Sequence, residues 1–134
     1  MSYVLLDTDV ASLSFKRRLP PGLLVRLHGH QPCLSFVTLA ELTQWTELRH
    51  WGTQRRTALS EWLSHAVVLP YADEIAHTWG RVSAAAIQRG RRRPANDTWI
   101  AACALAYGIP LATLNLKDFV DFSEHHGLKI VSNG

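Results

Sequence analysis

Four acidic residues, far apart in the chain, stand where their carboxylates could act together. They are Asp7, Glu41, Asp97 and Asp118. Clustered carboxylates repel one another unless a cation lies among them. Oxygen-only ligands select hard ions such as Mg²⁺ or Mn²⁺, and such an ion lowers the pKa of a bound water and stabilises a leaving oxygen. If these side chains meet, they suit metal-assisted hydrolysis that needs no side-chain nucleophile.

The elements that would position these acids alternate between apolar runs and helical patterns. Predicted strands cover residues 3–6, 33–37, 66–69, 109–113 and 128–132. Predicted helices cover residues 9–18, a short segment at 23–27, 38–48, a segment that ends near residue 65, 73–88, 97–107 and a short segment at 114–119, and residues 29–32 are expected to form a turn. This alternation predicts an α/β fold, with helices packed on a mostly parallel sheet of four to five strands.

The same alternation predicts where the acids lie. Ligands of parallel α/β sheets bind outside the carboxyl ends of the strands. Asp7 follows the first predicted strand, Glu41 the second and Asp118 the fourth. Asp97 opens a helix at the same end of the sheet. We therefore expect the four carboxylates to converge at one edge.

Each acid also has a purely structural interpretation. Asp97, or Asn96 beside it, could be the N-cap of its helix. Residues 38–41 match a capping box, in which Glu41 would bind the backbone at the start of its own helix. Asp9 could cap the first helix. Separate structural explanations for acids that all point to one edge are less economical than one shared site.

Four segments together resemble the PIN-domain ribonucleases and, within that family, the VapC-type toxins of bacterial toxin–antitoxin pairs. They are Asp7-Thr8 after an apolar strand, residues 38–42, residues 96–102 and residues 113–119. The resemblance implies a three-layer α/β/α PIN-like domain. It also implies an endoribonuclease that depends on Mg²⁺ or Mn²⁺, cuts RNA, forms a homodimer and is held inactive by a VapB-type antitoxin.

The resemblance also assigns roles to single residues. The acidic set of the family falls on the four acids named above, as catalytic residues and metal ligands. Thr8, Thr113 and Asn115 match positions that support the same pocket. Two departures stand out: members of this type commonly have asparagine where this chain has Asp9, and in many PIN domains the fourth acid falls where Asn115 stands.

The basic residues suggest how a polyanion would be held. Eleven of the 14 cations are arginine, whose planar guanidinium suits phosphate. Arg91, Arg92 and Arg93, together with Arg89, precede Asp97 and are predicted to form a rim that contacts RNA phosphates. The alternatives are a solvated loop or a contact with the antitoxin.

Composition limits the remaining possibilities. The 134 residues predict one domain spanning 1–134, and an apolar fraction of 47% indicates a globular chain. No signal peptide or membrane-spanning run is evident, so we expect a cytoplasmic protein without a membrane partner. Cys33 and Cys103 lie in apolar segments and are expected to be buried thiols. The seven histidines show no spacing typical of a zinc site.

Two rival functions remain at this point. Residues 7–10 after an apolar strand also resemble the opening motif of haloacid-dehalogenase-type phosphatases, in which Asp7 would be a nucleophile. That alternative needs a later lysine, and Lys117 is poorly placed for it. The other rival is a non-catalytic binding module that keeps only the PIN fold, and the complete acidic set argues against it.

Overall fold

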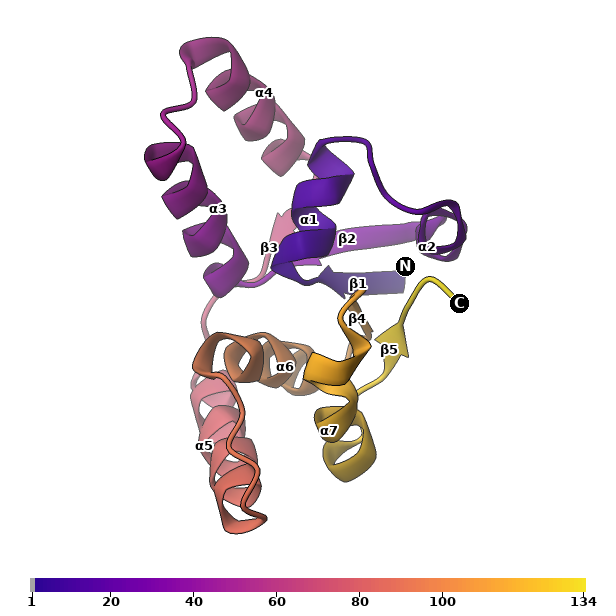
Figure 1. The fold of residues 1–134 in the computed structure, drawn as a ribbon, viewed down its shortest axis with the longest axis vertical. Coiled ribbons are helices and arrows are strands. Elements are labelled where there is room, and N and C mark those ends of the chain that lie inside the picture. Colours follow the sequence, from indigo (N-terminus) through magenta and orange to yellow (C-terminus); the bar gives the residue numbers. More distant parts are fainter. Residues whose placement is uncertain (1) are drawn as a thin grey trace.

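Five parallel strands form one sheet in the order β3-β2-β1-β4-β5 (Figure 1). They are β1 (Ser2–Leu6), β2 (His30–Leu34), β3 (Val67–Val68), β4 (Leu111–Ala112) and β5 (Ile130–Val131). The computed structural model describes residues 2–134. The central strand β1 pairs with β2 on one side and with β4 on the other, so the chain builds the sheet outwards in both directions from β1.

Seven helices in the described part of the chain cover both faces of this sheet. They are α1 (Thr8–Phe15), α2 (Pro21–Leu27), α3 (Phe36–Leu48), α4 (Thr53–Ser64), α5 (Asp73–Gln88), α6 (Ala95–Tyr107) and α7 (Leu116–His126). Figure 1 shows α1 to α4 on one side of the sheet and α5 to α7 on the other. This arrangement confirms the predicted three-layer α/β/α architecture.

The core is divided between the two faces by the alternation of side chains along β1. Val4 and Leu6 pack with α1, α2 and α3 in one apolar cluster. Leu5, between them, faces the other cluster, which is formed mainly by α5, α6 and α7. A strand buried on both faces is apolar at successive positions, which explains why this run has no polar alternation.

The second strand differs from its prediction. It was expected at residues 33–37 after a turn at 29–32, but β2 runs from His30 to Leu34. Pro32 within it is tolerated because β3 pairs only with Cys33 and Leu34, so β2 has no partner on that side at Pro32. Ser35 then ends the strand by capping α3, with its hydroxyl accepting from the Thr38 N–H at 3.1 Å.

Two helix ends also bear on the predictions. Gly108 ends α6 in the left-handed conformation with φ of 67°, as its position after the apolar run indicated. The last helix is longer than expected and continues to His126, so His125 and His126 form its final turn. No helix among residues 2–134 is both long and apolar enough to cross a membrane.

Candidate active site

Asp7 stands at the carboxyl end of the central strand. Its backbone N–H donates to the Ala112 carbonyl at 3.1 Å, which ties it to the neighbouring strand β4. The next strand in sequence, β2, pairs with β1 on one side, and the later strand β4 pairs with it on the other. In open α/β sheets a strand with such neighbours marks the crevice in which ligands bind. The observed topology therefore puts Asp7 where a functional carboxylate is expected.

Asp7 is buried, with only 3% of the residue's surface exposed. It is the N-cap of α1 and accepts from the Val10 N–H at 2.8 Å, so the prediction of Asp9 as this cap was wrong. Burial raises the pKa of Asp7 from 3.8 to about 6. Hydrogen bonds from Thr113 and Val10 oppose this rise, and the charges of Asp9 and Asp97 add to it. Asp7 is thus poised to change its charge near neutral pH.

Glu41 lies on the second turn of α3 and does not cap that helix. Its Oε1 accepts from the Thr8 hydroxyl at 2.7 Å, and its Oε2 accepts from the Asn96 amide at 3.5 Å. The Thr8 hydroxyl also lies 3.0 Å from the hydroxyl of the buried Thr38. Because Ser35 is the cap of α3, the capping-box interpretation of Glu41 was wrong. Glu41 is instead tied to α1 and α6.

Asp97 lies in the first turn of α6 and is half-buried. The N-cap of this helix is Pro94, and therefore neither Asn96 nor Asp97 fills the capping position that was one alternative for them. Burial raises the pKa of Asp97, and the nearby charges of Asp118 and Glu41 raise it further, while Arg93 lowers it. Asp97 thus shares one electrostatic environment with acids from two other helices.

The loop between β4 and α7 brings the remaining predicted residues to the same edge. Thr113 is fully buried, and its hydroxyl accepts from the Asn115 N–H at 3.0 Å. The Asn115 amide donates to Asp9 at 2.9 Å. Asp118 lies in the first turn of α7, close enough to affect the pKa of Asp97. Thr8, Thr113 and Asn115 therefore each hold, or help to hold, an acid of this edge.

The arginines of residues 89–93 differ in exposure and in contacts. Arg91 and Arg92 are exposed. Arg93 is half-buried, and its guanidinium donates to the Asp118 carbonyl at 3.4 Å. Arg89, also expected on the rim, forms an ion pair with the buried Asp121 at 2.7 Å instead. Arg89 therefore anchors the end of α5 to α7, and Arg93 supplies positive charge beside the acids.

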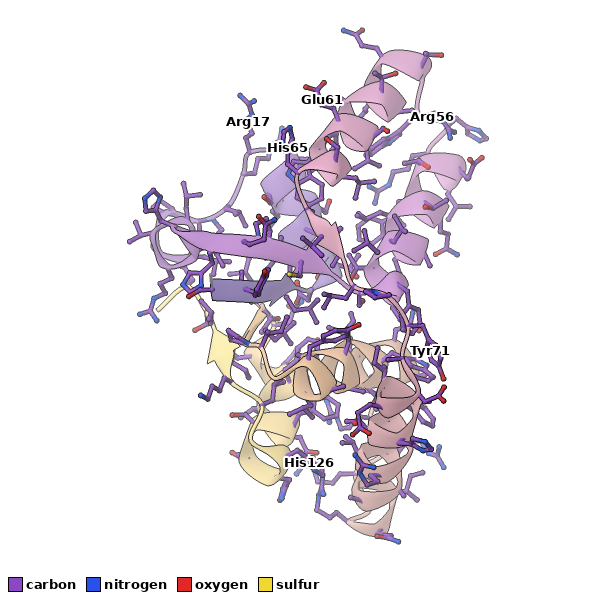
Figure 2. The ribbon with its side chains drawn as sticks, turned by 180° about the vertical axis from the view of Figure 1, so that it is seen from behind. Arg17, Arg56, Glu61, His65, Tyr71 and His126 are labelled. Atoms are coloured by element: carbon purple, nitrogen blue, oxygen red, sulfur yellow. The ribbon has the colours of Figure 1, made fainter. Side chains whose placement is uncertain are left out.

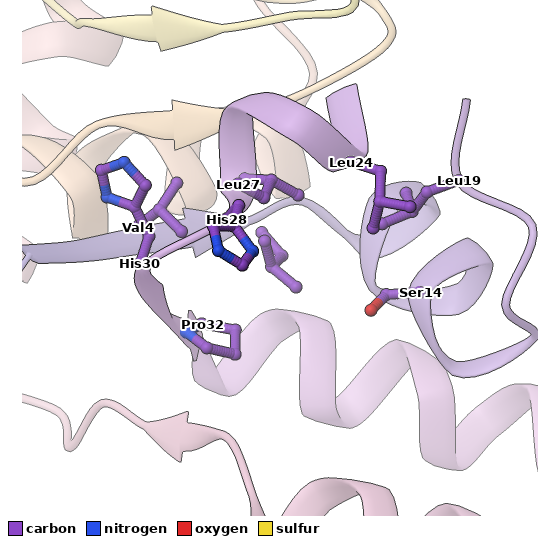
Figure 3. A pocket seen from close by; sticks show the side chains of 9 residues that line it. Val4, Ser14, Leu19, Leu24, Leu27, His28, His30 and Pro32 are labelled. Carbon is purple, nitrogen blue, oxygen red and sulfur yellow. The ribbon is translucent and has the colours of Figure 1, made fainter. Parts of the chain in front are cut away.

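Two other hollows contain none of the four acids. One, of about 360 Å³, lies between α2 and the sheet and is mainly apolar, with His28 and His30 at its edge (Figure 3). Another, of about 510 Å³, lies between the ends of α1 and α4, where Figure 2 shows Arg17, Glu61 and His65. The first has no carboxylate and the second has only that of Glu61, so neither offers the group of carboxylates that the predicted chemistry requires.

The donor set at the sheet edge fits a hard divalent cation by chemical type. It consists of oxygen ligands alone. Burial raises the pKa values of Asp7 and of Asp97, and repulsion from neighbouring acids adds to this rise. Among residues 2–134, no three His, Cys, Asp or Glu side chains stand in an arrangement that could already hold a metal ion. Several of these carboxylates are engaged by neighbours, such as Thr8 at Glu41 and Asn115 at Asp9.

Sequence reasoning missed two residues of this arrangement. Thr38 was assigned to a cap but is buried beside Thr8, and Asn96 was considered only as a cap but binds Glu41. Ser35, a favoured N-cap residue three positions earlier, was the signal that Thr38 is not itself the cap. No local signal could have shown the contact of Asn96, because 55 residues separate it from Glu41.

Comparisons with known proteins bear on the fold and the family of the chain. Residues 4–131 match the PIN domain family. The chain is 30% identical over 117 residues to Ribonuclease VapC2 of Haemophilus influenzae, which covers 86% of this chain and 88% of that protein. It is also similar to VapBC-1 from nontypeable Haemophilus influenzae, with a TM-score of 0.79, 26% identity and 98% of each chain covered.

A further similar structure is VapBC-5 from Mycobacterium tuberculosis, a member of the VapBC family of toxin–antitoxin systems. Its TM-score is 0.71 at 28% identity, with 98% of this chain and 99% of that chain covered. The phosphatase interpretation of Asp7 is not supported by these matches. Lys117, the lysine considered for it, is exposed on α7.

Proposed function

Because this chain belongs to the PIN-domain family and, within it, to the VapC ribonucleases, we propose that it is a metal-dependent endoribonuclease toxin. It hydrolyses phosphodiester bonds of RNA and is neutralised by a cognate VapB-type antitoxin. The observation that carries the proposal is the group of acids at the carboxyl end of β1. Asp7, Glu41, Asp97 and Asp118 come from four segments. Burial and, to a smaller extent, the charges of neighbouring acids raise the pKa values of Asp7 and Asp97.

These four acids are the residues that would hold Mg²⁺ or Mn²⁺. When bound, such an ion would polarise the scissile phosphate and lower the pKa of the attacking water. Each acid must be ionised to act as a ligand, and a pKa of about 6 leaves Asp7 mostly ionised at neutral pH. Burial thus keeps Asp7 poorly hydrated, but its carboxyl group does not stay protonated at neutral pH.

The neighbouring polar residues act as positioning groups. Thr8 and Asn96 hold the two carboxylate oxygens of Glu41, and Asn115 holds Asp9. Arg93 offsets part of the negative charge around Asp97. Partners of this kind fix the orientation of ligand side chains, and their loss typically weakens metal affinity or activity.

The proposed partners follow from the surface and from the relatives. Arg91 and Arg92 are exposed in the segment that leads to Asp97, and there they can contact RNA phosphates. The similar VapBC-5 structure is described as a toxin–antitoxin system, which supports an antitoxin partner here. Leu24 and Val25 of α2 are 57% and 74% exposed, and such apolar surface suits burial against the antitoxin or in a homodimer. We place the protein in the cytoplasm, with its RNA substrate.

A cleavage assay with matched proteins tests the proposal. The wild type and Asp97→Asn are purified in parallel, so that a contaminating nuclease would appear in both. We expect the wild type to cut RNA with Mg²⁺ or Mn²⁺, to stop in chelator and to be blocked by the co-purified antitoxin. Equal cleavage by both proteins, or full cleavage in chelator, would overturn the proposal.

A further inference from the structure

We propose that the hollow beside Glu41 and Asn96 binds one nucleobase of the RNA, next to the phosphate that is cut, and that Gln44 helps to select that base. This inference rests on the proposed ribonuclease function and adds a specificity site to it. The site is a hollow of about 480 Å³ between α3 and α6.

The hollow is formed by helical faces that converge on the acidic edge. Phe36, Ala40 and Gln44 are spaced four residues apart on α3 and therefore lie along one face of that helix. Asn96 and Trp99, three residues apart, contribute from the first turns of α6. Ala40 is the smallest side chain of this set and is exposed, so its position leaves the hollow open.

Aromatic side chains give the hollow a fixed apolar wall. Trp99 is stacked on Trp79, with ring centroids 5.0 Å apart and 24° between the planes. Phe36 meets Trp99 edge to face at 5.8 Å, and Tyr71, labelled in Figure 2, packs edge to face on Phe36 at 6.5 Å. Rings held from several sides lose little freedom when a base stacks on them, and proteins bind single-stranded RNA through such platforms.

The polar groups of the hollow suit a base better than a phosphate. None of its lining residues is cationic, so a phosphate would find no counter-charge there. Gln44 and Asn96 instead offer carboxamides, which hydrogen-bond to base edges. The Asn96 amide lies 3.5 Å from the Glu41 carboxylate, which also lines the hollow. A base held here would therefore belong to a nucleotide adjoining the acids.

Sequencing of cut ends from a random RNA pool tests the role of this hollow. We expect the wild type to prefer one base at a position next to the cut. Gln44→Ala should lose that preference at that position alone while still cutting RNA. Ala40→Leu, which fills the hollow, should slow cleavage roughly 5- to 150-fold, since stacking of one base is worth about that factor. Matched controls are Gln88→Ala and Ala84→Leu, which change exposed residues of α5 and should behave as wild type.

A binding measurement keeps this inference separate from the cleavage chemistry. Nitrogen-15 spectra are recorded in chelator with a five-nucleotide RNA of mixed sequence. We expect shifts of the side-chain N–H signals of Gln44, Asn96 and Trp99, and their loss in Ala40→Leu. If the wild type cuts no RNA, the proposed function fails, and these shifts still decide whether the hollow binds a base.

Three outcomes would overturn the inference. The first is an unchanged base preference in Gln44→Ala together with normal cleavage by Ala40→Leu. The second is a set of RNA-induced shifts that all lie away from the hollow. The third is that Ala40→Leu cuts RNA normally but has an altered oligomeric state in light scattering, or altered binding of the antitoxin. The hollow would then be a contact with another protein chain.

Discussion

Asp7 caps α1, but its buried negative charge opposes folding. Substitution by asparagine separates these two effects, because it keeps the cap and removes the charge. Asparagine caps helices as well as aspartate does, so Asp7→Asn keeps the hydrogen bond from Val10. The carboxyl has a higher pKa in the folded than in the unfolded chain, so the folded state binds its proton more tightly. Its ionised form therefore opposes folding, and stability is lost as the pH rises from about 4 to about 6.

The expected result is a pH-dependent gain in stability. In chelator, Asp7→Asn and wild type should unfold alike below about pH 4. Above about pH 6 the variant should be more stable by up to about 3 kcal/mol, which corresponds to a shift from 3.8 to about 6. Urea unfolding at several pH values measures this difference. A variant that is less stable than wild type at neutral pH would show that the carboxylate itself stabilises α1.

Thr8 is expected to act through Glu41. Thr8→Val keeps the shape of a mostly buried side chain but removes the hydroxyl that donates to Glu41 at 2.7 Å. We expect cleavage to fall about 10- to 100-fold, with partial recovery at higher Mg²⁺ concentration, because partners of ligands tune metal affinity. Thr57→Val, at an exposed position of α4, is the control. A loss that no Mg²⁺ concentration relieves would argue against this positioning role.

At the scale of elements, α3 and α6 show which helix ends are held by side chains. Ser35 caps α3, whereas Asp97 caps nothing and lies inside α6. Ser35→Ala should therefore lower the free energy of unfolding by about 1 kcal/mol. Asp97→Asn should leave it unchanged or raise it, since one crowded charge is removed. Urea unfolding of both variants at neutral pH checks this contrast, and the reverse order of stability would restore the cap interpretation of Asp97.

These helix ends also show how far the sequence could predict the structure. The apolar runs gave the alternation of strands and helices, and the acids that follow them gave the shared edge. The start of α3 was misplaced because Ser35 and Thr38 both suit an N-cap, and the choice depends on where β2 ends. The partner of Glu41 could not be predicted, because Thr8 lies 33 residues away and the contact exists only after β1 and β2 pair.

For the whole molecule, the distribution of charge predicts how RNA is held. The net charge is only +3, so attraction of a polyanion depends on where the cations stand. With Asp97→Asn as a non-cutting background, replacing Arg91 and Arg92 by alanine should weaken RNA binding for all sequences alike. The slope of log affinity against log salt should flatten by about 1.4, because each single-strand phosphate contact contributes about 0.7.

One control variant completes this measurement. Arg26→Ala, at an exposed position of α2, should leave the salt slope unchanged. Arg93 is excluded from the pair because its half-buried guanidinium contacts Asp118 and its loss would disturb the acids as well. An unchanged slope in the double variant, with loss of the antitoxin complex, would assign these two arginines to the antitoxin.

The central position of β1 has a consequence for the order in which the protein can become active. β1 is synthesised well before its partner β4, which lies more than 100 residues later, and Asp97 and Asp118 arrive with α6 and α7. Pairing between such distant segments forms late in folding. A ribosome that has not yet made α6 and α7 therefore carries Asp7 and Glu41 without Asp97 and Asp118. We therefore expect the nascent chain to leave the messenger from which it is translated uncut until α6 and α7 have emerged.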